Sequence, residues 1–126
     1  MRVSSGGPWE EKFGYSRAVT AGPWILVAGT TSTVDGVVTH VGDAYGQTLT
    51  AFGIALDALE RCGSGPSDVV QTRMYVTDMA LQEEVGRAHR GLFGEVRPVA
   101  TMVAVAGLAH PDHLVEVELT AYRDPA

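Results

Sequence analysis

The chain has 126 residues, of which 45% are hydrophobic and 19% are charged, a composition that predicts one folded domain over residues 1–126. No apolar stretch approaches the roughly 20 residues that span a bilayer, and the first residues lack the apolar run of a signal peptide, so we expect neither a membrane protein nor a secreted precursor. The formal net charge is -6 and the only lysine is Lys12, which argues against nucleic acid as a partner.

The first third of the chain predicts an irregular arm followed by short strands. Residues 1–12 mix glycine, serine, proline and charge, which is typical of irregular structure. Strands are predicted over residues 16–20 and 24–28, on either side of a Gly-Pro turn. The Asp-Gly pair at residues 35–36 lies between valines and predicts a hairpin.

Two helices are predicted where apolar residues recur at spacings of three and four. The first begins after Asp43 and stops at Gly63, and its apolar stripe comprises Tyr45, Leu49, Phe52, Leu56 and Leu59. The second follows Asp78 and ends before Pro98, and its stripe comprises Leu81, Val85, Ala88 and Leu92.

Three more strands are predicted, over residues 69–77, 99–105 and 114–122. Two helices cannot cover both faces of such a sheet, so we expect an α+β fold with both helices on one face. The uncovered side of residues 69–105 reads as nearly all small or apolar, which favours burial against another subunit and therefore an oligomer.

Several residues with reactive side chains have a structural and a functional interpretation. His110 and His113 flank Asp112 and could bind a metal, but a solvated turn is favoured, and we expect no metal site and no cofactor. His89 is either a general base or, as favoured, a hydrogen-bonded structural residue. Cys62 ends a helix and is expected to be an unreactive thiol in a reducing, cytoplasmic setting.

The last predicted strand carries two carboxylates on one face. Glu116 and Glu118 lie two residues apart, so one of them acquires a raised pKa if the pair is buried, as an acid/base site requires. Two solvated carboxylates fit the pattern equally well. Arg73 lies in the middle of a strand, where pairing with Glu116 or Glu118 is favoured over binding of an anionic ligand.

Five segments together resemble the Rid family of reactive intermediate deaminases, also called YjgF-like or L-PSP endoribonuclease-like proteins. The resemblance extends from about residue 14 to residue 122, and the segments that carry it are Gly14–Ser16, Trp24–Gly29, Asp68–Asp78, Arg97–Val103 and Leu114–Glu118. It implies a chorismate-mutase-like α+β fold with a mixed sheet and two helices on one face. It also implies a homotrimer whose sheets form a central barrel, with a small-molecule ligand in a cleft between adjacent subunits.

The resemblance further implies a chemistry from which this chain departs. Deaminases of this family hydrolyse enamines and imines, and an arginine holds the substrate carboxylate. Ala100 stands at that arginine's position, followed by Thr101 and Met102 in place of serine and cysteine. Loss of a buried contact of this kind costs roughly 2–5 kcal/mol. Arg73 is the favoured replacement anchor, ahead of Arg17, and Arg97 is expected to be structural.

Other positions match the family. Tyr15 matches the tyrosine of the cleft, Gly29 the glycine that lets a ligand approach the backbone, and Glu116 the carboxylate that orients a water molecule. Thr30, next to Gly29, is included among the expected binding residues.

Three functions are therefore considered. They differ in whether the chain is an enzyme, so that question is open too. The favoured one is hydrolysis of enamine or imine C=N bonds by water positioned at Glu116. The alternative is a non-catalytic trimer that binds a metabolite, favoured by Ala100. An endoribonuclease is disfavoured by the net charge of -6.

Overall fold

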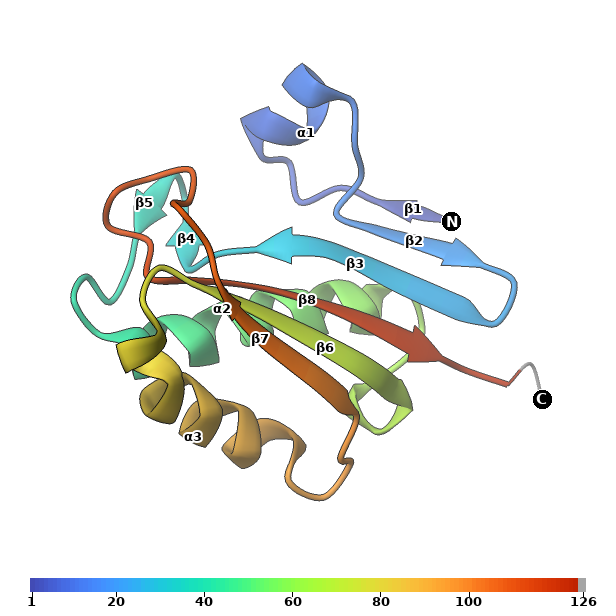
Figure 1. Ribbon diagram of the computed structural model, residues 1–126. Helices are drawn as coiled ribbons and strands as arrows, with labels where there is room; N and C mark the ends of the chain where they lie inside the picture. The colour runs from blue at the N-terminus through green and yellow to red at the C-terminus, as the bar shows by residue number, and fades with distance from the viewer. Residues whose placement is uncertain (125–126) are drawn as a thin grey trace.

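Six strands form one sheet, and two helices pack on a single face of it. The computed structural model describes residues 1–124 (Figure 1). In chain order the elements are β1 (Arg2–Val3), α1 (Pro8–Phe13), β2 (Ala18–Ala21), β3 (Trp24–Thr30), β4 (Thr33–Val34), β5 (Val37–Val38), α2 (Ala44–Arg61), the 3-10 turn η1 (Pro66–Asp68), β6 (Val69–Val76), the 3-10 turn η2 (Met79–Leu81), α3 (Gln82–Phe93), β7 (Val99–Ala104) and β8 (Val115–Tyr122).

The sheet has the strand order β1-β2-β3-β8-β6-β7. Its neighbours are antiparallel except β6 and β7, which are parallel and are joined through α3, as a parallel pair requires a crossover. Strands β4 and β5 form a separate hairpin around Asp35 and Gly36, whose φ angles of 51° and 78° fit the turn that an Asp-Gly pair favours. The predicted hairpin is confirmed.

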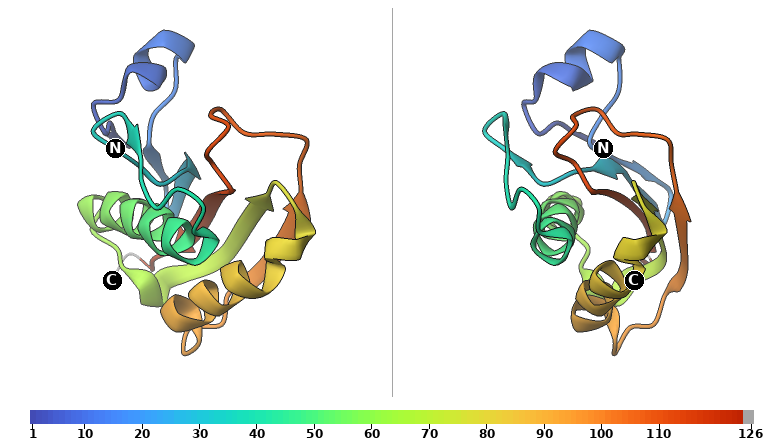
Figure 2. Two further views of the ribbon diagram at one scale, coloured as in Figure 1. Left: turned by 90° about the vertical axis from the view of Figure 1, so that its left-hand side faces the viewer. Right: turned by 60° about the vertical axis from the view of Figure 1, so that its left-hand side comes forward.

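Helices α2 and α3 lie side by side on one face of the curved sheet (Figure 2). On β8 every second side chain is buried against these helices. The buried residues are Val115, Val117, Leu119 and Ala121. Phe52 of α2 and Phe93 of α3 meet over this face with ring centroids 5.1 Å apart. The α+β fold with α2 and α3 on one face is confirmed.

Helix α2 begins as predicted, because the Asp43 side chain accepts a hydrogen bond from the Gly46 N–H at 3.0 Å. It ends at Arg61, and Gly63 follows with a φ of 82°. Its buried side differs from the predicted stripe. Phe52 and Leu59 are fully buried, but most of the other buried residues of the helix are small. These small residues are Ala44, Thr48, Ala51, Ala55 and Ala58. Small side chains let the helix approach both the sheet and α3.

The N-terminal arm is more ordered than predicted. Arg2 and Val3 pair with β2, and Pro8 starts the short helix α1, which Gly14 ends with a φ of 76°. A single-turn helix is too short for an apolar period, so the pattern could not reveal it. The chain therefore has three α-helices within residues 1–124, and α1 stands apart from the other two (Figure 1).

The face of the sheet that the helices leave uncovered is not mainly apolar, so that expectation was wrong. Strand alternation brings polar side chains of β6 and β8 to this face, which are Gln71, Arg73, Tyr75, Glu116, Glu118 and Thr120. Apolar side chains remain exposed at its margins, which are Trp24, Leu26, Val99 and Val103. These polar side chains therefore make the uncovered face the place where chemistry can occur.

Among the helices of residues 1–124, none combines the length and apolar character that crossing a membrane requires.

Candidate functional site

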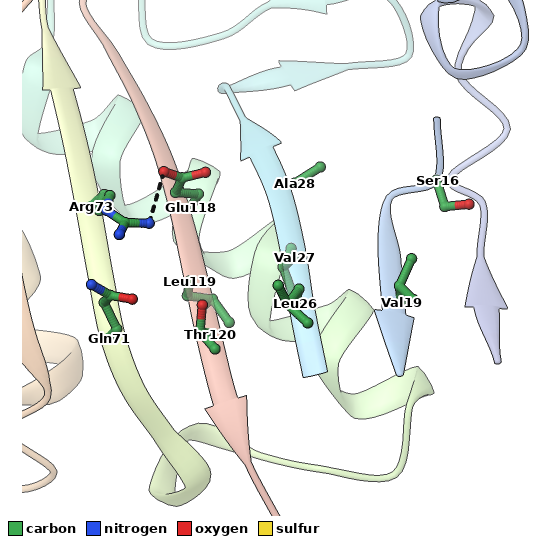
Figure 3. Close-up of a pocket in the computed structure, with 10 residues that line it drawn as sticks. All are labelled: Ser16, Val19, Leu26, Val27, Ala28, Gln71, Arg73, Glu118, Leu119 and Thr120. Carbon is green, nitrogen blue, oxygen red and sulfur yellow. Dashed lines mark ion pairs between the residues drawn. The ribbon is translucent and has the colours of Figure 1, made fainter. Parts of the chain in front are cut away.

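A hollow of about 280 Å³ lies on the uncovered face of the sheet (Figure 3). Residues of four adjacent strands line it, which include Val19 of β2, Leu26 of β3, Arg73 of β6 and Glu118 of β8. Next to it, toward the Thr30 end of β3, lie Gly29 and Glu116, two of the residues that the sequence selected for a binding site.

The Glu116 side chain lies against the backbone of strand β3. A Cβ atom on residue 29 would lie 3.1 Å from Glu116 Cδ and would overlap its Oε2, so a larger residue there would force the end of this side chain to move. Strand β3 also contains one extra residue between Val27 and Thr30 relative to β8, a bulge of the type that re-aims side chains beside active sites. Gly29 therefore serves close approach, here of the Glu116 carboxyl to the backbone.

Burial raises the pKa of Glu116 above its usual value. The nearby Arg17 guanidinium opposes this rise, and the charge of Glu118 adds to it. Of the two possibilities left open for the carboxylates, the structure supports partial burial with a raised pKa at Glu116. A carboxylate with a raised pKa is suited to accept a proton from water.

Arg17 connects the predicted residues around Glu116. Its Nη1 donates to the carbonyl oxygen of Gly29 at 2.6 Å and to Thr30 Oγ1 at 3.0 Å. Its Nη2 reaches the Tyr15 hydroxyl at 3.5 Å, and its side chain is 12% exposed. The structure thus brings together Tyr15, Gly29, Thr30 and Glu116, with the guanidinium as their common neighbour.

A second polar cluster lies next to the first on β6 and β8. Arg73 Nη1 lies 3.5 Å from Glu118 Oε1, as its cross-strand register dictates. The Tyr75 hydroxyl also donates to Glu118, and this hydrogen bond is the main cause that raises the pKa of Tyr75. The favoured ion pair of Arg73 is confirmed, with Glu118 rather than Glu116 as partner. Its role as a ligand anchor stays a prediction.

Ala100, which stands where family deaminases have an arginine, and its neighbours Thr101 and Met102 lie apart from Glu116 of the same chain. Strand β6 separates β7 from β8. Met102 packs against the core on the helix side, and Ala100, two residues earlier, has the same orientation along the strand. Thr101 lies opposite Arg73 and shares its face. Ala100, Thr101 and Met102 therefore do not join the Glu116 cluster of their own chain.

The histidines have structural roles. His89 Nε2 lies 2.8 Å from Thr72 Oγ1, and burial lowers its pKa, which confirms the structural interpretation. His113 is buried rather than solvated, so the predicted turn was wrong at this residue. Its Nε2 lies 2.9 Å from Thr33 Oγ1, and Gln47 of α2 binds the loop on both sides of it. Residues 1–124 contain no cluster of His, Cys, Asp or Glu that could hold a metal ion.

Two further predictions concern single residues. Exposed Arg97 has a φ of 56° and donates through Nε to the carbonyl oxygen of Gly94 at 3.0 Å, which agrees with the structural role expected of it. Cys62 is half-buried at the end of α2, and burial raises its thiol pKa, which disfavours the reactive thiolate.

Sequence reasoning missed Glu10, which is 5% exposed and lies 3.6 Å from Arg17 Nε. It falls in the segment interpreted as irregular. The signals that could have placed it were Pro8 and Gly14, the start and stop of α1.

Gly29→Ala is expected to destabilise the fold by about 1 kcal/mol, the lower end of the cost of overpacking, because the added methyl group forces the Glu116 carboxyl to move. Urea denaturation measures this loss. Gly53→Ala is the matched control, since a Cβ atom there meets nothing within 4 Å and alanine favours the helix. Equal stability of the two variants would contradict the close approach at Gly29.

Glu116→Gln is expected to unfold at a higher temperature than wild type at pH 7, with the two converging in acid. A raised pKa means that the folded state binds the Glu116 proton more tightly than the unfolded state does. Protonated Glu116 therefore contributes its full share of stability below the unfolded-state pKa. This contribution is lost as the pH rises through the folded-state pKa. Glutamine resembles the protonated acid and avoids that loss. Thermal melts from pH 4 to pH 8 measure the difference, and exposed Glu95→Gln is the control. A Glu116→Gln midpoint below wild type at pH 7 would contradict the raised pKa.

Comparisons with known proteins identify the family and support the fold. The family profile described as Endoribonuclease L-PSP matches residues 10–123. The crystal structure of Rv2704 from Mycobacterium tuberculosis, described as a member of the YjgF/YER057c/UK114 family, is 45% identical and superposes with a TM-score of 0.88, covering 97% of this chain and 98% of that one.

Two further relatives are similar in sequence. The uncharacterized protein SCO2049 of Streptomyces coelicolor is 46% identical over 122 residues, which are 97% of this chain and 91% of that protein. The 3-aminoacrylate deaminase RutC of Acinetobacter baylyi is 32% identical over 85 residues, which are 68% of this chain and 67% of that protein. The chain therefore belongs to the Endoribonuclease L-PSP family, the Rid or YjgF-like family that its sequence motifs resemble.

Proposed function

We propose that the protein hydrolyses the C=N bond of small enamine-derived or imine substrates with a water molecule positioned by Glu116. The observation that carries this proposal is the partly buried Glu116 carboxyl, which lies against Gly29, is influenced by the charge of Arg17 and has a raised pKa. The relative named as a 3-aminoacrylate deaminase supports a deaminase-type reaction.

Hydrolysis of a C=N bond requires one proton acceptor and one positioned water molecule. The substrate reacts as its protonated iminium. The Glu116 carboxylate takes a proton from water while the water oxygen bonds to the iminium carbon, which forms a neutral carbinolamine. The proton then passes from Glu116 to the amine nitrogen. The C–N bond breaks as the hydroxyl group gives its proton back to the Glu116 carboxylate, which leaves a carbonyl compound and ammonia or an amine. An enamine enters the same sequence after protonation of its carbon, which gives the iminium. A positioned general base contributes on the order of 10²–10⁴ in rate.

The site is expected to be completed between adjacent subunits of a homotrimer. The exposed apolar side chains at the margins of the uncovered face, Trp24, Leu26, Val99 and Val103, support contact with another copy. In such an assembly Tyr15, Gly29, Thr30 and Arg73 line the ligand cleft around Glu116, and Ala100, Thr101 and Met102 lie on an edge strand that can face a neighbouring subunit.

Imine hydrolysis tests the proposal directly. 2-Iminopropanoate is generated from alanine by an amino-acid oxidase, and ethanimine from ethylamine by an amine oxidase, and the loss of each imine is followed with and without the protein. Acceleration of either supports the hydrolase. No acceleration of any imine in a panel of both kinds would overturn it.

A non-catalytic, metabolite-binding trimer is the second candidate, and Ala100 favours it. Alanine removes the charged side chain with which family deaminases hold their substrate. This candidate predicts ligands that raise the thermal unfolding midpoint while none is consumed. Ligand consumption in the same samples would exclude it.

A further inference from the structure

The N-terminal arm places a carboxylate of the chain itself on Arg17. Glu10 Oε1 accepts the Ser5 backbone N–H at 3.1 Å, and Glu10 Oε2 accepts the Ser5 hydroxyl and lies 3.6 Å from Arg17 Nε. Both Glu10 and Arg17 are nearly buried, at 5% and 12% exposure. The arrangement is a small carboxylate-binding site, and Glu10 fills it.

Helix α1 holds Glu10 in this position and joins it to the candidate site. The backbone N–H groups of Gly14 and Tyr15 both donate to the Glu10 carbonyl oxygen at 2.9 Å. Tyr15, the expected cleft residue, therefore follows directly from the turn that carries Glu10. Burial alone would raise the pKa of Glu10, but hydrogen bonds from Ser5 and the charge of Arg17 hold it below its usual value, so Glu10 is ionised at neutral pH.

Both arginines of the site are already paired without a ligand. Arg17 pairs with Glu10 and is the cation whose charge acts on Glu116, while Arg73 pairs with Glu118. An incoming carboxylate would compete with Glu10 for Arg17 and with Glu118 for Arg73, and would add a negative charge beside Glu116. Partly buried like charges repel strongly, because little water screens them. A ligand without a carboxylate avoids this repulsion.

We propose that Glu10 determines the specificity of the site: by occupying Arg17 with a carboxylate of the chain, it selects imines that carry no carboxylate over 2-imino acids. The inference rests on the proposed C=N hydrolysis and names its substrate class. It also accounts for Ala100, since a substrate without a carboxylate needs no arginine at that position.

Ethanimine and 2-iminopropanoate test the proposal as a matched pair, because they differ only by the carboxylate. Wild type is expected to prefer ethanimine. Glu10→Ala frees Arg17 and the Ser5 donors, and is expected to shift the ratio of kcat/KM toward 2-iminopropanoate by about tenfold or more, which corresponds to about 1.4 kcal/mol. Glu11→Ala is the matched control, because Glu11 is the exposed neighbour on the same helical turn and should leave the ratio unchanged.

Binding of a stable carboxylate provides a readout that does not need turnover. Calorimetry with pyruvate is expected to give tighter binding to Glu10→Ala than to wild type or Glu11→Ala. Glu10→Gln keeps the volume of the side chain and removes its charge, so it serves if the alanine variant does not fold, with a shift in the same direction.

The outcomes separate this inference from the function on which it rests. Hydrolysis of ethanimine by wild type, with neither the kcat/KM ratio nor pyruvate affinity changed in Glu10→Ala and Glu10→Gln, would overturn the inference and leave the hydrolase standing. A wild-type preference for 2-iminopropanoate would also overturn it. Hydrolysis of no imine, together with tighter pyruvate binding to the Glu10 variants, would refute the hydrolase and support Glu10 as the residue that excludes anions.

Discussion

Replacing Glu116 with glutamine is expected to lower the rate of C=N hydrolysis by a factor on the order of 10²–10⁴, the usual contribution of a general base. Glutamine is nearly the same size and keeps a carbonyl oxygen at the position of the carboxylate, but it cannot accept a proton from water. The loss should therefore appear in kcat, with KM changed little. Steady-state hydrolysis of ethanimine measures both constants.

The stability of the same variant rules out a trivial explanation of such a loss. Glu116→Gln should be at least as stable as wild type at pH 7, because a partly buried charge is removed. Glu95→Gln removes an exposed carboxylate and should keep full activity. Unchanged kcat in Glu116→Gln would refute the role of Glu116, whereas loss of activity with loss of stability would indicate misfolding.

Replacing Phe52 with alanine is expected to destabilise the protein by about 3–5 kcal/mol, the usual cost of removing a buried aromatic ring. Phe52 is fully buried where α2 faces α3, and its ring contacts those of Phe93 and His89 at centroid distances of 5.1 and 5.7 Å. The cavity would also remove support from His89 and from its hydrogen bond to Thr72 on β6. Urea denaturation at pH 7 measures the loss.

The control for this prediction is the same substitution at an exposed ring. Phe13 on α1 is 65% exposed, so Phe13→Ala should change the free energy of unfolding by less than about 0.5 kcal/mol. If Phe52→Ala does not fold, Phe52→Leu refills most of the cavity and should cost less than about 1.5 kcal/mol. A loss in Phe52→Ala as small as that in Phe13→Ala would mean that the two helices do not share one core.

The two predictions describe opposite contributions to one molecule. Phe52 and its neighbours stabilise the helix layer, while Glu116 on the other face is kept at a cost in stability because its burial opposes ionisation. A charged group retained in an unfavourable position is more easily explained by function than by folding. The strained ionisation of Glu116 therefore supports C=N hydrolysis at the uncovered face.

Much of the fold was accessible from sequence because its signals are local. The alternation of residues 115–121, the apolar spacing of α2 and α3, the Asp43 cap and the Asp-Gly turn each depend on a few neighbouring residues. The single turn α1 and the loop around His113 were misjudged. Their order comes from partners distant in sequence, such as Gln47 for the loop, which lies 65 residues from Asp112.

Within the candidate site, the sequence by itself determined that Glu116 and Glu118 share a face, because the period of a strand requires it. Only the tertiary structure decided that Arg73 lies on the same face, which of these charges are paired and which carboxylate has a raised pKa. Register joined Arg73 to Glu118, the β3 bulge brought Gly29 against Glu116, and the arm carried Glu10 onto Arg17. Charge pairing and burial depend on distances between strands and arm that no local pattern encodes, which is why the occupant of Arg17 emerged only from the fold.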